Sequence, residues 1–135
     1  GTYYVQALAW STDAFLVSWS VGALATAILV VNNVRDIDSD TRADKRTLAV
    51  RWGRRFGILE YASLMGLAYG LLPFFWFGLG RSVFVLLPLL SLPRALKLYR
   101  TLAQEVDGPP LNAALAGTAQ LSLVFSLLLA LGWIL

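Results

Sequence analysis

Carboxylate and basic side chains are concentrated in one short segment, residues 32–47, of this 135-residue sequence. Three aspartates fall within five positions of it: Asp36, Asp38 and Asp40. Magnesium prefers carboxylate oxygens and is usually held by one or two carboxylates together with the phosphates of a substrate. Lys45 and Arg46, in the same segment, suit the neutralisation of the remaining phosphate charge. The segment therefore predicts a site for magnesium and a diphosphate, with Asp36 and Asp40 as the catalytic metal ligands.

The spacing of the oxygen-bearing side chains predicts a strip on one helix face. If the preceding helix continues, positions four residues apart share a face, and these are Asn32, Asp36, Asp40 and Asp44. Carboxylates at this spacing repel one another, so a cation must compensate. Either neighbouring basic side chains do so as internal salt bridges, or a divalent ion does. Asn32 and Asn33 stand at the edge of an apolar run, where polar groups tend to face a cavity.

A non-catalytic interpretation competes with the metal site. Charge-rich loops between membrane spans are usually solvated connectors facing lipid headgroups. The chain would then be a membrane module, such as a scaffold with a lipid-binding basic loop or part of an ion-coupled transporter. Transport is disfavoured because Asp13, the only acidic residue well away from the predicted cytoplasmic loops, lies at a span boundary.

The composition indicates a membrane protein. Hydrophobic residues make up 58% of the chain and charged residues 14%, with a mean hydropathy of +0.67. Soluble domains are nearer 45–50% apolar and about 25% charged. The absence of Cys and His excludes disulfides, zinc sites, thiol nucleophiles and histidine acid–base chemistry. The net charge of +3 favours anionic partners; we expect membrane lipid and no nucleic acid.

The elements that must position the polar segment are transmembrane helices. Residues 14–34 form a charge-free run of 21, about 31 Å of helix against a hydrocarbon core of about 30 Å. Gly66 and Gly70 have the small-xxx-small spacing that favours close helix packing. The tyrosines and phenylalanines of residues 61–77 are expected to face lipid more than substrate. The complete spans are predicted at about 14–34, 57–80, 83–99 and 113–135, the third bent at Pro88 and Pro93.

The basic residues predict the topology. All Lys and Arg except Arg81 fall in or beside the first and third connections. The positive-inside rule then places the Asp-rich loop 35–55 in the cytoplasm. Residues 1–12 are apolar but too short to span, so we interpret them as the end of a further helix. The sequence thus predicts an all-α polytopic bundle, four complete spans plus the end of a fifth, in an inner or cell membrane.

Two blocks of this segment carry a family resemblance. Asn-Asn-Val-Arg-Asp-Ile-Asp-Ser-Asp (32–40) and Lys-Arg-Thr-Leu-Ala-Val-Arg-Trp-Gly (45–53) resemble the second aspartate-rich motif of UbiA-type intramembrane prenyltransferases. Residues 1–6 and 111–121 also resemble the C-terminal half of that family. The likeness is strongest to the branch that prenylates 1,4-dihydroxy-2-naphthoate in menaquinone biosynthesis. CDP-alcohol phosphotransferases also use aspartates and magnesium, but residues 30–40 lack their signature.

The resemblance implies an activity and roles for single residues. It implies a nine-helix fold around a lipid-accessible cavity, in which Mg²⁺ assists departure of diphosphate from a polyprenyl diphosphate and an aromatic acceptor captures the prenyl group. Asp36 and Asp40 would bind magnesium with help from Asp38; Lys45 and Arg46 would contact the diphosphate; Asn32 and Asn33 would be polar cavity residues. The family's first aspartate-rich motif is absent, so we expect 1–135 to be one part of a single domain, inactive without the N-terminal half.

Overall fold

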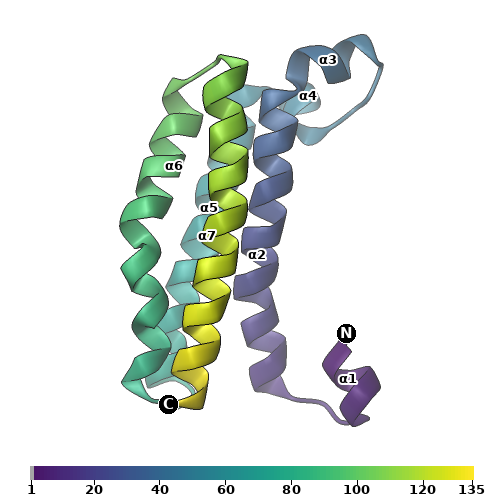
Figure 1. Cartoon of the computed structure of the whole chain (residues 1–135). Coiled ribbons are helices and arrows are strands. Elements are labelled where there is room, and N and C mark those ends of the chain that lie inside the picture. Colours follow the sequence, from purple (N-terminus) through teal and green to yellow (C-terminus); the bar gives the residue numbers. More distant parts are fainter. Residues whose placement is uncertain (1) are drawn as a thin grey trace.

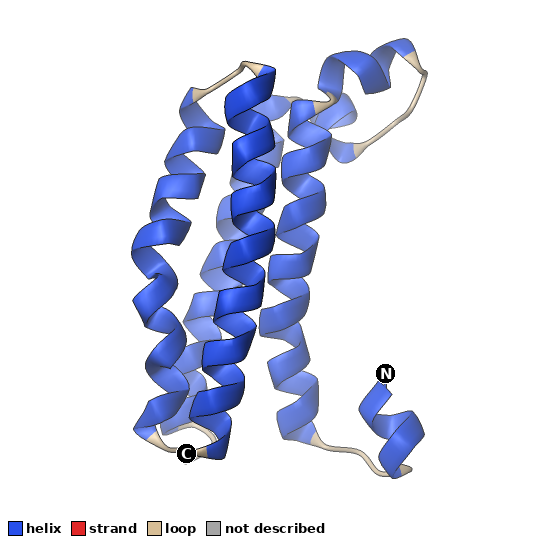
Figure 2. Ribbon diagram, in the orientation of Figure 1, coloured by secondary structure: helices blue, strands red, loops and turns tan. Residues whose placement is uncertain are grey.

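The computed structural model describes residues 2–135, which fold into helices with no strand in that range. The long elements run side by side, and α3 and α4 lie together at one end, called the polar end below (Figure 1). Short loops join consecutive helices (Figure 2). The elements are α1 (Thr2–Ala7), α2 (Thr12–Arg35), α3 (Ile37–Arg42), α4 (Leu48–Trp52), α5 (Arg54–Phe77), η1 (Val83–Ser91), α6 (Leu92–Gln104) and α7 (Gly108–Ile134).

Within residues 2–135, three helices, α2, α5 and α7, are long and apolar enough to cross a membrane. They contain 24, 24 and 27 residues, and about 30 Å of hydrocarbon requires about 20 residues. In lipid, a helix satisfies its own backbone hydrogen bonds, which makes it the favoured conformation for apolar runs of this length. The predicted all-α membrane bundle is confirmed.

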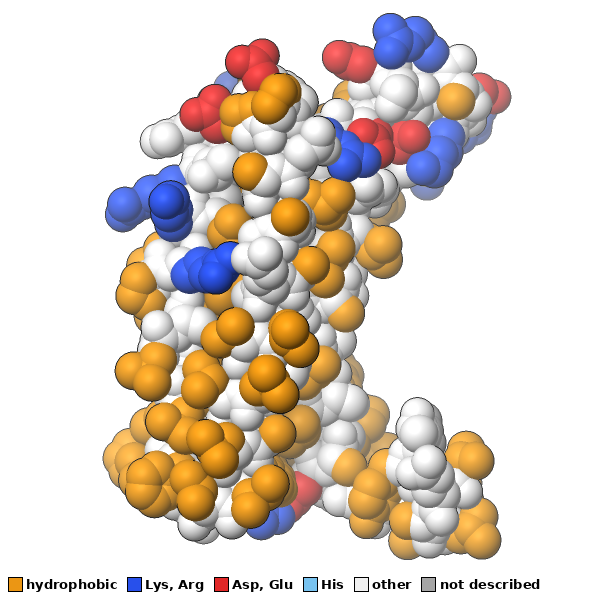
Figure 3. All heavy atoms as spheres, in the orientation of Figure 1, with side chains coloured by type: hydrophobic (Ala, Val, Ile, Leu, Met, Phe, Trp, Pro, Cys, Tyr) orange, Lys and Arg blue, Asp and Glu red, His pale blue; other side chains and the backbone are white. Residues whose placement is uncertain are grey.

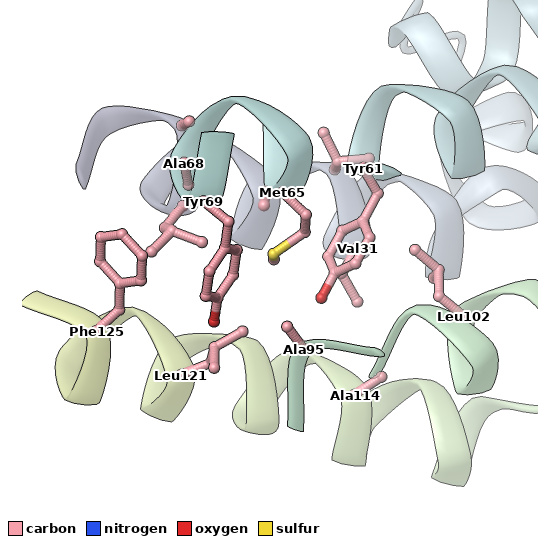
Figure 4. Packing of buried hydrophobic residues seen from close by; sticks show 14 of the residues in the cluster. Val31, Tyr61, Met65, Ala68, Tyr69, Ala95, Leu102, Ala114, Leu121 and Phe125 are labelled. Atoms are coloured by element: carbon pink, nitrogen blue, oxygen red, sulfur yellow. The ribbon is translucent and has the colours of Figure 1, made fainter. Parts of the chain in front are cut away.

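The core forms where the long helices face one another. Buried residues recur every three or four positions, as in α2 at Ser20, Ala23, Leu24, Ala27, Val30, Val31 and Val34. Side chains from α5 and α7 interdigitate in the same way (Figure 4). Lipid tails are as apolar as these side chains, so van der Waals packing rather than water exclusion holds the helices together.

Glycines allow close helix approach, but not at the predicted positions. Gly66 and Gly70 are exposed, and a Cβ on either would meet no atom of another helix of the described chain within 4 Å. A Cβ on Gly57 would instead lie 2.4 Å from Val34, and one on Gly132 would lie 2.0 Å from the Phe84 carbonyl oxygen. Spacing alone did not show which face of each helix meets a neighbour.

Several helix ends differ from the sequence prediction. The last helix begins at Gly108 rather than near residue 113, with Pro109 and Pro110 inside its first turn. Proline is tolerated there because the first N–H groups of a helix have no intrahelical partner. The helix predicted at about 57–80 is α5, Arg54–Phe77, and the chain turns at Gly80 with φ +62°.

The segment predicted as a bent helix at 83–99 consists of two helical parts. Residues Val83–Ser91 are a 3₁₀ helix containing Pro88, and α6 continues from Leu92 to Gln104 with Pro93 in its first turn. The prolines thus mark the change of helix type. This segment is not among the helices of the described chain that meet the length and hydropathy of a membrane span, so a fourth crossing stays a prediction.

Polar side chains form hydrogen bonds between helices inside the bundle and an ion pair at the distal end, which is the end opposite the polar end. Tyr61 shares a 3.1 Å hydrogen bond with Thr118, and Tyr69 shares one of 2.7 Å with Ser91. Both tyrosines are buried between helices (Figure 4), so the expectation that they face lipid was wrong. At the distal end Arg81 pairs with Asp13.

Candidate functional site

The Asp-rich segment begins where α2 bends into α3. Asp36 leaves helical geometry, with φ −96° and ψ 12°. Its N–H nevertheless donates to the Asn32 carbonyl at 3.0 Å, and the Asp40 N–H donates to the Asp36 carbonyl at 2.8 Å. Because these hydrogen bonds retain the four-residue spacing, Asn32, Asp36 and Asp40 stay on successive turns, as predicted.

Arg35 gathers polar side chains from two helices. Its guanidinium makes a two-pronged contact with Asp36, from Nε to Oδ1 and from Nη2 to Oδ2, both at 2.7 Å. Nη2 also donates to the Asn32 side-chain oxygen at 2.8 Å, and Nη1 donates to that of Asn112 at 2.9 Å. Asn112 lies in the first turns of α7. These four residues, the Arg35 cluster, join the end of α2 to the start of α7.

Arg35 changes the acidity of its partner. The charged hydrogen bond from Arg35 holds the pKa of the Asp36 carboxyl below its ordinary value, against a smaller opposing effect of burial. The positive charges of Arg35 and Lys45 act in the same direction. Asp36 is therefore an anion at neutral pH, which is the form that binds cations.

The lowered pKa predicts a pH-dependent contribution to stability. The Arg35–Asp36 pair should stabilise the fold at every pH above about 4, the ordinary aspartate pKa, and lose this effect as pH falls through the lowered pKa of Asp36. Melting of the full-length protein in detergent, compared with its Asp36→Asn variant, measures this effect. The difference in Tm should be constant from pH 7 to about 5 and shrink below about 4. A difference that grew on acidification would contradict the assignment.

Asp40 is paired with Lys45 across the turn that follows α3. Lys45 Nζ lies 3.2 Å from Asp40 Oδ1, and its backbone N–H donates to the Asp40 carbonyl at 2.9 Å. Asp40 is buried, with 10% of its side chain exposed. Asp44 has φ +52°, which takes it out of helical geometry. The predicted strip therefore ends at Asp40 and does not include Asp44.

The remaining predicted site residues lie apart from the Arg35 cluster. Asp38 is exposed on α3, and Asn33 is half-buried with no side-chain hydrogen bond to any of residues 2–135. Arg46 is exposed and lines a pocket of about 460 Å³ together with Lys45 and Arg51. The structure thus divides the site into an acidic and amide side, around Asp36, and a basic side, around Arg46.

Short helices set the positions of the basic residues. The Thr47 side chain accepts a hydrogen bond from the Val50 N–H at 3.3 Å and caps α4. Gly53, with φ +83°, makes the turn between α4 and α5, a conformation that residues with a Cβ rarely adopt. Arg54 then donates to the Leu102 carbonyl at the end of α6. The motif 45–53 therefore packs against α2 and α5 at the polar end, and Arg54, which follows it, joins α5 to the end of α6.

The donor set suits a magnesium–phosphate group only in part. In the described chain there is no group of three or more acidic or histidine side chains placed to hold a metal. Asp36 and Asp40 supply two carboxylates on successive turns, which matches a magnesium ion whose other ligands are waters and substrate phosphates. Both carboxylates face basic side chains of this chain, Arg35 and Lys45. Internal salt bridges, one of the two alternatives from the sequence, are thus present in the described chain.

The sequence indicated Arg35 only as one of several basic residues that could form internal salt bridges with the aspartates, and it indicated no site role for Asn112. Arg35 stands next to Asp36, and Asn112 is an uncharged polar residue at the start of an apolar span. Polar groups in such positions tend to face a cavity or a partner. This tendency was the signal in the sequence that could have identified Arg35 and Asn112 as site residues. Their contact, between residues 77 positions apart, was not predictable from spacing.

Comparisons with known proteins identify the family. The model of the UbiA prenyltransferase family matches residues 1–124. The 1,4-dihydroxy-2-naphthoate octaprenyltransferase of Escherichia coli is 36% identical over 98% of this chain and 43% of its own length. The UbiA prenyltransferase domain-containing protein 1 homologue of Drosophila melanogaster is 36% identical over 90% of this chain and 32% of its own.

The match is partial with respect to the relatives. The chain spans less than half of the length of these two proteins. The 1,4-dihydroxy-2-naphthoate octaprenyltransferase of Mycobacterium tuberculosis is 45% identical over a shorter stretch, 55% of this chain. No solved structure matches. With a family model covering residues 1–124 and an all-helical membrane bundle, the chain belongs to the UbiA prenyltransferase family.

Proposed function

We propose that this chain is part of an enzyme that transfers a polyprenyl group from its diphosphate to 1,4-dihydroxy-2-naphthoate, in menaquinone biosynthesis. The observation that carries the proposal is the Arg35 cluster, which holds an ionised aspartate and two amide oxygens at the polar end of an apolar bundle. The names of the bacterial relatives support the acceptor. Prenyl transfer needs such a combination, because the donor has a charged head and a long apolar tail.

In this proposal the acidic residues of the site bind the cation and the basic residues bind the diphosphate. Asp36 and Asp40 would hold Mg²⁺, with Asp38 near them on α3; the ion, when bound, neutralises diphosphate oxygens and favours the departure of the leaving group. Lys45 and Arg46 would face the diphosphate. Asn32 and Asn33 would provide polar contacts below the metal, at the edge of the membrane.

Arg35 has an additional role in this proposal. In the structure it neutralises Asp36 through both oxygens. A guanidinium binds phosphate with the same two-pronged geometry as carboxylate. Arg35 therefore keeps Asp36 ionised without substrate, and it can turn to a phosphate oxygen when a cation takes its place on Asp36.

We propose that the rest of the protein completes the site. The chain covers 43% of its Escherichia coli relative, and the described residues hold two paired carboxylates rather than a full ligand set. The remaining part would contribute the other aspartate-rich motif and the facing cavity wall. By the positive-inside rule, the polar end with its Arg and Lys residues lies in the cytoplasm.

The isolated polypeptide 1–135 is therefore expected to be inactive. In detergent with magnesium, a polyprenyl diphosphate and the naphthoate, it should give no turnover above a sample without protein. The full-length protein, purified in the same way, is the positive control. Appreciable turnover by residues 1–135 would show that this part contains a complete site and would overturn the proposed division.

The acceptor is tested on the full-length protein. Membrane vesicles containing it are given a polyprenyl diphosphate and either 1,4-dihydroxy-2-naphthoate or 4-hydroxybenzoate, and lipid-soluble products are separated by chromatography. We expect prenylated naphthoate and little prenylated benzoate. The opposite preference would keep the family but reject the acceptor.

A further inference from the structure

A groove between α6 and α7 carries basic side chains on the outside of the bundle. It has a volume of about 780 Å³. Arg94 and Lys97 line it from α6, and Gln120 lines it from α7, over a floor of small residues that includes Gly117. Figure 3 shows basic side chains gathered over α6, below the charged groups of the polar end. None of these residues belongs to the Arg35 cluster.

The groove lies deeper than the ends of the apolar spans. From Val83 to Arg94, nine residues of 3₁₀ helix and three of α-helix rise about 22 Å. From Leu135 back to Gln120 the rise is also about 22 Å. The charge-free run 14–34 of α2 is about 31 Å long. The distal ends of these elements lie together, because Arg81 pairs with Asp13 and stacks on Trp133. Arg94 and Gln120 therefore meet about 9 Å short of the polar end of the charge-free run of α2.

The positive charge in this groove is not balanced by the described chain. Arg94 donates a hydrogen bond to the Gln120 side-chain oxygen. Neither Arg94 nor Lys97 has an ion-pair partner among residues 2–135. Basic side chains inside a membrane are costly and mark positions where they meet an anion or water. An anion with an apolar part would satisfy both the charges and their surroundings.

We propose that the α6–α7 groove binds the phosphate group of a ligand through Arg94 and Lys97, at a site separate from the Asp-rich segment. Two sources supply this chemistry: an anionic phospholipid and a free phosphate anion. Gln120 holds the Arg94 guanidinium over the groove. Leu123 and Leu127 are exposed one and two turns further along α7, on the side of Gln120 where an acyl chain would run.

The steric fit supports a shallow groove rather than a deep pocket. A Cβ on Gly117 would lie 2.6 Å from a Leu98 methyl group, so α6 and α7 are already in contact at the floor. Lys97 also lines the groove, and its ammonium makes no hydrogen bond to any of residues 2–135. A headgroup phosphate would lie on small residues between two cations.

The test measures phosphate binding by the full-length protein. Delipidated protein in neutral detergent is titrated with phosphatidylglycerol, and separately with inorganic diphosphate, and bound ligand is counted by native mass spectrometry. The variants are Arg94→Gln with Lys97→Gln together, and Arg100→Gln as the matched control, since Arg100 is on the same helix but outside the groove. Prenyl transfer is assayed in parallel.

The double variant should bind phosphatidylglycerol about thirtyfold more weakly, because each basic side chain near a lipid phosphate contributes a factor of about five. The Arg100→Gln protein should bind like the parent. Loss of lipid binding with diphosphate binding unchanged assigns the groove to phospholipid, and loss of diphosphate binding alone assigns it to the free anion. If the double variant bound phosphatidylglycerol as tightly as the parent, and also bound diphosphate as tightly as the parent, the proposal would be overturned.

Discussion

Replacing Asp36 by alanine in the full-length protein is expected to lower prenyl transfer by about 100-fold or more while the protein still inserts into the membrane. Loss of one preorganised electrostatic group at a reaction centre typically costs about 100- to 1,000-fold in kcat. Asp36 is an anion in contact with Arg35 at 2.7 Å, so the substitution removes a proposed metal ligand and frees the guanidinium. Turnover is measured in vesicles at saturating donor, and insertion by protease protection of the polar end.

Two further variants separate a chemical role from a structural one. Asp40→Ala should cause a similar loss of activity, since Asp40 is the other proposed ligand on the next turn. Asp107→Asn, an exposed carboxyl before α7, should leave the rate within about twofold, because solvated surface groups contribute little. Parental rates in both Asp36→Ala and Asp40→Ala would end the proposed assignment. A large loss in Asp107→Asn would show that the site had been misplaced.

Replacing Gly132 by alanine is expected to lower the stability of the fold more than other substitutions of glycine by alanine, such as Gly66→Ala. The added Cβ would come within 2.0 Å of the Phe84 carbonyl oxygen, 2.6 Å of its carbon and 3.0 Å of the Val85 Cα. These are backbone atoms, so no side-chain rotation relieves the clash, and α7 must move away from η1. Overpacking of this kind costs about 1–3 kcal/mol and sometimes more. Thermal unfolding of the full-length protein in detergent, followed by tryptophan fluorescence, should show a lower Tm.

Gly66→Ala is the matched control because it makes the same change in the middle of α5. Apart from the adjoining residues and the backbone of α5 itself, no atom of the described chain lies within 4 Å of the added Cβ, and alanine is the better helix former by about 1 kcal/mol. Its Tm should equal or exceed that of the parent. If Gly132→Ala were as stable as Gly66→Ala, the close contact between α7 and η1 would not exist in the membrane. If Gly66→Ala were strongly destabilised, another part of the full-length protein must pack there.

Much of the fold follows from local properties of the sequence. Charge-free runs such as 14–34 form helices in lipid because no water is present to satisfy an open backbone. The four-residue spacing of Asn32, Asp36 and Asp40 held through the bend after Arg35, since i to i+4 hydrogen bonds cross it. The sequence predicted the helix ends less accurately, as at Gly108. The reason is that proline is tolerated in the first turn of a helix, so it marks a helix boundary less clearly there than in a helix interior.

The sequence alone determined that this protein lies in a membrane, that it forms helices, and which segment carries most of its acidic and basic side chains. Tertiary structure decided the partners: Asn112 reaches Arg35 from 77 residues away, Tyr61 is buried against Thr118, and Gly132 rather than Gly66 is the point of close approach. The physical reason is the range of the interactions. Hydropathy and helical spacing depend on neighbours within a few turns, whereas the rotation of one apolar helix against another depends on side chains from the whole bundle.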